Sequence, residues 1–114
     1  IDALERLIEL EGRRVDLLAQ LAQIKFFVAG RSLTDEVHAL IDEILDKDPR
    51  EPTALGILGV EAFDDGRYEQ AIGYWRRALA GFEDSASAEA IRKGIAVAEQ
   101  RLEQSANEAG LVVD

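Results

Sequence analysis

The sequence predicts an all-α fold, a solenoid built from helix–turn–helix repeats. Residues 18–51 and 52–85 read as two copies of one 34-residue unit. Apolar residues also recur at spacings of three and four along most of the chain, between breaks that contain Gly or Pro. A hairpin repeated at this period buries its apolar stripes by stacking on its neighbours. The weaker alternative is a helical bundle without repeats.

The second copy fits the tetratricopeptide (TPR) pattern best, in which W-x-x-L-G-x-x-Y is followed by A-x-x-x-F and P. The second copy keeps the Leu58-Gly59 pair, whereas the first copy has Lys25 at the position of the Gly. The first copy ends with the expected Pro, Pro49, whereas the second copy has Glu83 at that position. The matched pairs are Leu21/Leu55, Ile24/Leu58, Val28/Ala62, Val37/Ala71, Ile41/Trp75 and Ile44/Ala78.

Helix-capping residues predict where the three helices before the second copy begin and end. A helix is expected over about 3–11, where Asp2 and Glu5 resemble a capping box, and another over about 16–29, ending at Gly30. Thr34 is expected to cap the next helix. The flanking stripe of Leu4, Leu7 and Ile8 lacks a partner repeat, so we expect it to support self-association of the chain.

Turn residues place the remaining elements. The segment 46–52 breaks the chain, and Pro52 suits the first position of the fourth helix. A turn at 65–67 precedes a helix over about 68–80. A capping helix is then expected over about 86–104, followed by a tail at 105–114 that has no pattern and need not be ordered. Residues 1–104 would form a single TPR domain.

Composition excludes several classes of function. The net charge of −10 argues against binding to nucleic acid, which needs clustered Lys and Arg, and most acidic residues suit solvated helix faces. There is no cysteine and no apolar run long enough to cross a membrane, so we expect no direct membrane insertion by this chain. The first residue is Ile1 rather than Met, which leaves room for an anchor or a signal outside this sequence.

Catalytic chemistry is not predicted. His38 is the sole histidine and lies within a helix without a Ser or Cys partner at a recognisable spacing. The acidic pairs lack the spacing of a calcium loop, and no glycine-rich phosphate loop is present. Trp75 falls on an apolar stripe, which favours a role in the core. We therefore expect a binding module rather than an enzyme, with no metal and no cofactor.

The inferred binding site is the concave groove lined by the first helix of each repeat. Its positions are expected one residue beyond the packing stripe, and they are small or apolar, without the Lys and Asn of grooves that capture a peptide carboxylate. An amphipathic helix is the ligand that suits such a groove, with Phe26 and Phe63 as anchors; the alternative is that these side chains only contact neighbouring helices. The predicted groove residues are Ala22, Phe26, Ala29, Thr53, Gly56, Val60, Phe63, Ala90, Gly94 and Val97, with Ala19 and Ser87 on the same faces.

Several local motifs resemble the C-terminal TPR domain of the cytochrome c-type biogenesis protein family, which includes the TPR heme lyase subunit that serves formate-dependent nitrite reductase. The resemblance covers about residues 14–104 and departs at Arg13-Arg14, where a Pro-containing joint is common. The motifs are 45–55, Leu58-Gly59, Ala62-Phe63, Gly66-Arg67-Tyr68, Ala71-Ile72, Tyr74-Trp75, the loop 30–33 and the capping segment 87–96.

The resemblance implies a function in cytochrome c maturation. Such a domain would sit in the periplasm, tethered to the inner membrane by a segment outside this chain. It would hold the C-terminal helix of apocytochrome c and pass the apoprotein to the other subunits of the heme ligation complex. The alternatives are a generic TPR adaptor for another protein, and a module that assembles a larger solenoid.

Overall fold

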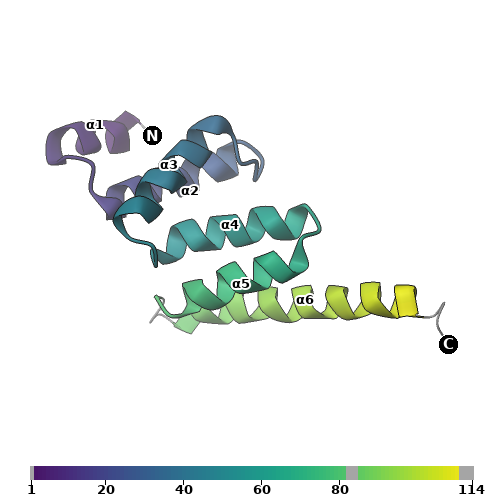
Figure 1. Ribbon diagram of the computed structural model, residues 1–114. Helices are drawn as coiled ribbons and strands as arrows, with labels where there is room; N and C mark the ends of the chain where they lie inside the picture. The colour runs from purple at the N-terminus through teal and green to yellow at the C-terminus, as the bar shows by residue number, and fades with distance from the viewer. Residues whose placement is uncertain (1, 82–84, 111–114) are drawn as a thin grey trace.

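The computed structural model describes residues 2–81 and 85–110, and in these ranges every regular element is an α-helix. Six helices follow one another as antiparallel neighbours in an elongated stack with principal extents of 63 × 29 × 22 Å (Figure 1). They are α1 (Asp2–Glu11), α2 (Val15–Val28), α3 (Asp35–Lys47), α4 (Pro52–Asp64), α5 (Tyr68–Leu79) and α6 (Ser85–Gly110). The predicted all-α, TPR-like solenoid is confirmed.

Helix starts follow the predicted capping chemistry. The Thr34 hydroxyl accepts a hydrogen bond from the backbone N–H of Val37 at 3.2 Å. Pro52 occupies the first turn of α4, and the buried Glu51 carboxylate before it accepts from the N–H of Ala54 at 2.7 Å. These side chains satisfy backbone donors that a helix start leaves without partners. The side chain of Asp2 lies outside the described residues, so its expected cap stays a prediction.

The expected end of the last helix was wrong. Helix α6 continues past Gln104 as far as Gly110, so residues 105–110 are helical rather than part of a tail. This stretch has no apolar stripe, which is why it read as a tail. It also has no Pro, and no Gly before Gly110, so nothing interrupts the backbone hydrogen bonding of a helix that is already formed. Residues 111–114 lie outside the described part.

Helix α1 packs more closely than the sequence suggested. Ile8 is buried and Leu4 is half-buried against the core that α2 and α3 form, so these two residues are not the unpartnered stripe we expected. Leu7 and Leu10 are the large apolar side chains of α1 that stay exposed, Leu10 by 78%. Arg13 holds the joint to α2, because its guanidinium makes two hydrogen bonds of 2.6 Å to the Glu43 carboxylate.

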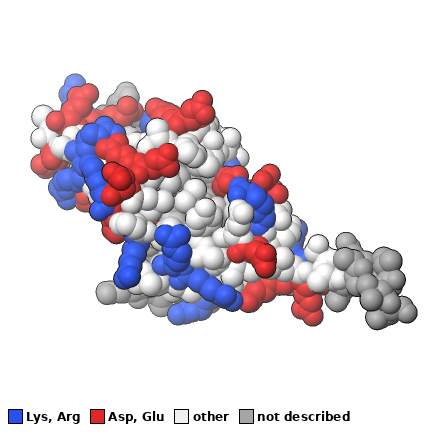
Figure 2. All heavy atoms as spheres, in the orientation of Figure 1, with Lys and Arg blue, Asp and Glu red and all other residues white. Residues whose placement is uncertain are grey.

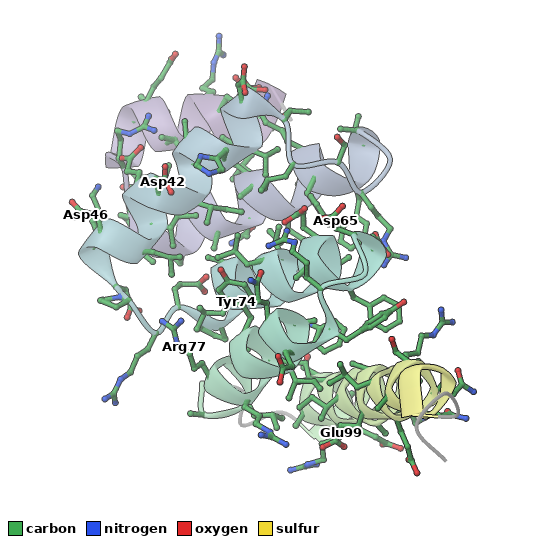
Figure 3. All side chains as sticks on the ribbon, turned by 45° about the vertical axis from the view of Figure 1, so that its right-hand side comes forward. Asp42, Asp46, Asp65, Tyr74, Arg77 and Glu99 are labelled. Atoms are coloured by element: carbon green, nitrogen blue, oxygen red, sulfur yellow. The ribbon has the colours of Figure 1, made fainter. Side chains whose placement is uncertain are left out.

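Charged side chains of both signs lie on the surface, around a stretch of uncharged residues on the face shown in Figure 2. Several connect successive elements. Arg76 on α5 pairs with Glu99 on α6 at 3.1 Å, and Arg77 donates to the carbonyl of Pro49 at 3.2 Å. Figure 3 shows Arg77 beside the connection between α3 and α4, where this bond ties the two repeats together.

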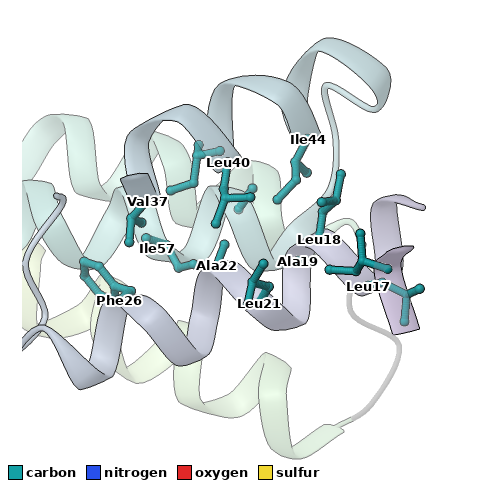
Figure 4. Packing of buried hydrophobic residues seen from close by; sticks show 13 residues of the cluster. Leu17, Leu18, Ala19, Leu21, Ala22, Phe26, Val37, Leu40, Ile44 and Ile57 are labelled. Carbon is teal, nitrogen blue, oxygen red and sulfur yellow. The ribbon is translucent and has the colours of Figure 1, made fainter. Parts of the chain in front are cut away.

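The core consists of two adjoining clusters. In the first, the side chains of Val37, Leu40 and Ile44 point from α3 towards α2, and Phe26 lies beside Val37 and Ile57 (Figure 4). The second joins α4, α5 and α6 around Trp75. A Cβ atom at Gly59 would overlap the indole of Trp75, so only glycine permits this approach of α5 to α4. Trp75 is 7% exposed, which confirms it as a core residue.

Candidate functional site: an apolar groove between α2, α4 and α6

A groove of about 400 Å³ runs along the face that α2, α4 and α6 share. The C-terminal half of α2 forms one wall, the exposed side of α4 forms the base, and the first turns of α6 form the other wall. None of the lining side chains is charged, and the polar ones are those of Gln23, Thr53 and Ser87. This surface therefore suits an apolar ligand surface better than a charged one.

Trp75, on the neighbouring helix α5, also lines the groove. Its indole N–H donates to the carbonyl of Gly56 at 3.4 Å, so the polar atom of the ring has a partner. On the α6 side, a Cβ atom at Gly94 would come within 3.1 Å of the ring. A Cβ atom at Gly56 would meet no other atom within 4 Å. Gly94 therefore lets α6 pack closely against the indole, and Gly56 leaves this part of α4 without a side chain in the groove.

Six of the ten predicted groove residues line this space: Phe26, Thr53, Gly56, Val60, Ala90 and Gly94, together with Ser87. The other four do not. Ala22 is completely buried between the helices, and Ala29 is the exposed C-cap of α2. Phe63 and Val97 lie one turn beyond the lined part of α4 and α6.

The predicted anchor Phe26 is a core residue rather than a binding residue. It is 0% exposed and is the largest fully buried side chain of the described chain. Its neighbour Phe27 is 53% exposed and stacks on it edge to face, with ring centroids 5.4 Å apart. Ile24 and Val28 are exposed beside Phe27. The aromatic side chain that α2 offers to a ligand is therefore Phe27.

An insertion between α2 and α3 explains this difference. Six residues connect α2 to α3, from Ala29 to Thr34, whereas three connect α4 to α5, from Asp65 to Arg67. Gly30 and Gly66 occupy the same place in the two turns, both with positive φ, and they are 36 residues apart. The 34-residue register holds for α3 and α5, but α2 matches α4 only when it is shifted by two residues.

The same shift accounts for Phe27, a lining residue that the 34-residue register did not indicate. With an offset of 36, Phe27 corresponds to Phe63 and Phe26 to Ala62, which is also buried. The spacing of the two turn glycines, Gly30 and Gly66, indicates this offset of 36 residues in the sequence. Trp75 was missed as a lining residue because a core position was expected to exclude it from the groove. The further unpredicted lining residues are Gln23, Pro52, Ile57 and Ile91.

Phe63 and Arg101 close one end of the groove. Phe63 is half-buried, packs against Tyr68 and Trp75 with ring centroids 5.3 and 5.8 Å away, and is covered by the guanidinium of Arg101 at 5.4 Å from its centroid. A cation over an aromatic face is attracted to it. Phe63 therefore forms the end wall of the groove rather than an open anchor site.

Chemical groups for catalysis do not gather in this part of the molecule. The groove has no titratable lining residue, and no cluster of His, Asp and Glu in the described ranges could hold a metal ion. His38 lies on the surface of α3 and pairs with Asp42 at 3.2 Å. No helix among the described residues is long and apolar enough to span a membrane. Contact with an apolar partner is the chemistry that the groove offers.

Comparison with known proteins gives the relatives of the chain. No family model matches it. It is 43% identical over 105 residues to the cytochrome c-type biogenesis protein CycH of Pseudomonas aeruginosa, an alignment that covers 90% of this chain. This domain is a homologue of part of CycH. The expected resemblance to that family is confirmed, although the chain spans only about a quarter, 26%, of the length of CycH.

Two further relatives belong to formate-dependent nitrite reductase complexes. Subunit NrfG of Escherichia coli O157:H7 is 34% identical over 77 residues, which cover 68% of this chain and 39% of NrfG. The bifunctional subunit NrfFG of Haemophilus influenzae is 30% identical over 87 residues, which cover 76% of this chain and 22% of NrfFG. A solved YfrE protein of Vibrio parahaemolyticus superposes with a TM-score of 0.62 at 24% identity, covering 75% of this chain and 94% of that one, and supports the fold alone.

Proposed function

We propose that this domain binds the C-terminal helix of apocytochrome c in the groove and presents it to the other subunits of the heme ligation complex. The observation that carries the proposal is the uncharged apolar groove over Trp75 in a chain homologous to CycH. The homology supports a role in cytochrome c maturation, and the groove supplies a surface for the apolar face of one helix. The domain would act by binding, without catalysis of its own.

The dimensions of the groove suit a short amphipathic helix. Along α4 the lined part of the groove extends from Pro52 to Val60, eight residue steps or about 12 Å, which matches about two turns of a ligand helix. Burial of apolar side chains against Phe27, Val60 and Trp75 supplies several kcal/mol, and ordering of the peptide costs about 2–5. We expect micromolar affinity, about −8 kcal/mol.

The location of the domain follows from the same proposal. Apocytochrome c receives heme in the periplasm in this kind of pathway, so we place the domain there, tethered to the inner membrane by a segment outside this chain. The net charge of −10 favours ligand helices with Lys on their polar face. Since the groove itself is uncharged, salt should change the affinity only modestly.

Two glycines provide a matched test. Gly56 lies within α4 and lines the groove, and Gly73 lies within α5 away from it. A Cβ atom would meet no other atom within 4 Å at either position, so both helices should accept a larger residue. Gly56→Leu would fill the groove, whereas Gly73→Leu would add the same side chain elsewhere.

Calorimetry with a synthetic apocytochrome c C-terminal peptide tests the proposal. Wild type and Gly73→Leu should bind at micromolar concentration, and Gly56→Leu should bind at least about tenfold more weakly, because one side chain occupies the space of an anchor. Equal binding by all three proteins would show that the groove is not the site. No binding by wild type would favour a TPR adaptor for another partner, or a solenoid module. A pull-down with apocytochrome and holocytochrome gives a second test that separates the apocytochrome c chaperone from such an adaptor.

A further inference from the structure

We propose that Arg101 receives the carboxyl terminus of the bound helix and thereby determines the direction in which the helix lies in the groove. This inference rests on the proposed function, because it names the end of the ligand that meets one end of the site. It makes Arg101 a specificity-determining residue that the apolar groove alone does not reveal.

Arg101 is on the groove side of α6. The lining residues Ala90 and Gly94 recur at a spacing of four, and Val97 and Arg101 continue that line at spacings of three and four. Arg101 is seven residues beyond Gly94, about 10 Å further along the axis. Its guanidinium lies over Phe63, one turn beyond Val60, where the lined part of α4 ends. It therefore stands at the end of the groove.

The charge of Arg101 is not neutralised. Among the side chains that the structure describes, no carboxylate forms an ion pair with Arg101, although the chain carries 23 acidic residues. The other arginines near this end have acidic partners: Arg31 pairs with Asp64 at 3.0 Å, and Arg67 pairs with Glu61 and Asp65. A ligand lying on the uncharged groove would thus meet one uncompensated cation, and it would meet it at this end.

A helix has a defined charge at each end. Its last carbonyl groups and its dipole make the C-terminal end negative, and a free terminal carboxylate adds a full charge. Arg101 favours that end, and it would repel the positive end of a helix bound in the reverse direction. The opposite end of the groove is lined by Pro52, Thr53 and Ser87, which carry no charge. The bound helix should therefore run parallel to α4 and α6.

The test uses two apocytochrome c C-terminal peptides of about 15 residues, four helical turns, that differ only in a free carboxylate or an amide at the last residue. Arg101→Gln removes the cation, and Arg101→Lys keeps it. Arg92→Gln is the matched control, because Arg92 lies nine residues earlier on α6, roughly 180° around the helix, and carries the same charge. Circular dichroism and melting temperature verify that all variants fold.

Wild type should bind the carboxylate peptide about three- to fivefold more tightly than the amide, the range of an exposed ion pair, and the ratio should fall with added salt. Arg92→Gln should keep the ratio, Arg101→Lys should keep part of it, and Arg101→Gln should reduce it to about one. Equal binding of the two peptides by wild type, or an unchanged ratio in Arg101→Gln, overturns the role of Arg101 while leaving the proposed function intact. Binding of neither peptide overturns both.

Discussion

The neighbouring residues Phe26 and Phe27 should respond in opposite ways to the same truncation. Phe26 is 0% exposed within the first core cluster, so Phe26→Ala leaves a cavity and should cost about 3–5 kcal/mol of folding free energy. Phe27 is 53% exposed, so about half of its side chain is already in water. Phe27→Ala should cost only about 1 kcal/mol of stability, but it removes the aromatic side chain that α2 offers to a ligand.

Urea unfolding and peptide calorimetry on both variants measure the two effects separately. Phe26→Ala should lower the urea midpoint strongly, with an unchanged slope if unfolding stays two-state. Phe27→Ala should unfold nearly like wild type and bind an apocytochrome c C-terminal peptide about tenfold more weakly, roughly 1.4 kcal/mol. Equal stability losses, or a larger loss for Phe27→Ala, would refute the two-residue shift of α2.

Three further predictions concern stability and assembly. Trp75→Ala should cost about 3–5 kcal/mol in urea unfolding, and a loss below about 1 kcal/mol would contradict its core role. The hydrogen bond from Arg13 holds the pKa of Glu43 below its ordinary value of 4.5, so this pair stabilises the fold above that pH and loses its effect as the pH falls. Glu43→Gln should therefore cost about 0.5 kcal/mol at pH 7, a small value because the pair is partly exposed, and progressively less as the pH falls through the lowered pKa of Glu43. Leu7 and Leu10 should support self-association in sedimentation at high concentration, and Leu10→Glu should weaken it; a wild type that is monomeric at about millimolar concentration would exclude it.

The packing of the second repeat could be predicted because its sequence contains the residues that indicate how its two helices contact each other. Leu58-Gly59 and Trp75 occupy positions where a missing Cβ atom and a large ring must fit together, and the structure shows that contact. Pro52 and Thr34 likewise begin helices for local reasons that need no knowledge of the fold. The structural role of such helix-starting residues depends only on neighbours within about one turn of the chain.

The first repeat was less predictable because α2 is apolar on most of its surface. Ten of its 14 residues are apolar, so the hydrophobic pattern does not distinguish its buried face from its exposed face. The 34-residue period therefore sets the register that the sequence predicts, and the longer loop before α3 breaks that period. Aligning Gly30 with Gly66, whose positive φ marks the same turn, would have identified Phe27.

The extent of the groove depends on contacts that no local pattern describes. The aromatic Phe63 fits an anchor position by spacing, but Arg101, 38 residues later, covers it. Trp75 lies in the core, only 7% exposed, and also lines the groove together with Gly56 and Gly94. Both facts follow from the packing of α6 on α5, beside α4, which the sequence does not specify residue by residue.

The signal of one indole N–H tests the central claim most directly. Trp75 is the only tryptophan of the chain, it lines the groove, and its N–H is bonded to the carbonyl of Gly56. In a ¹H–¹⁵N spectrum its resonance should shift saturably as an apocytochrome c C-terminal peptide is added, with the same micromolar constant that calorimetry gives. A peptide that binds by calorimetry while the Trp75 indole signal stays unmoved would contradict binding in this groove.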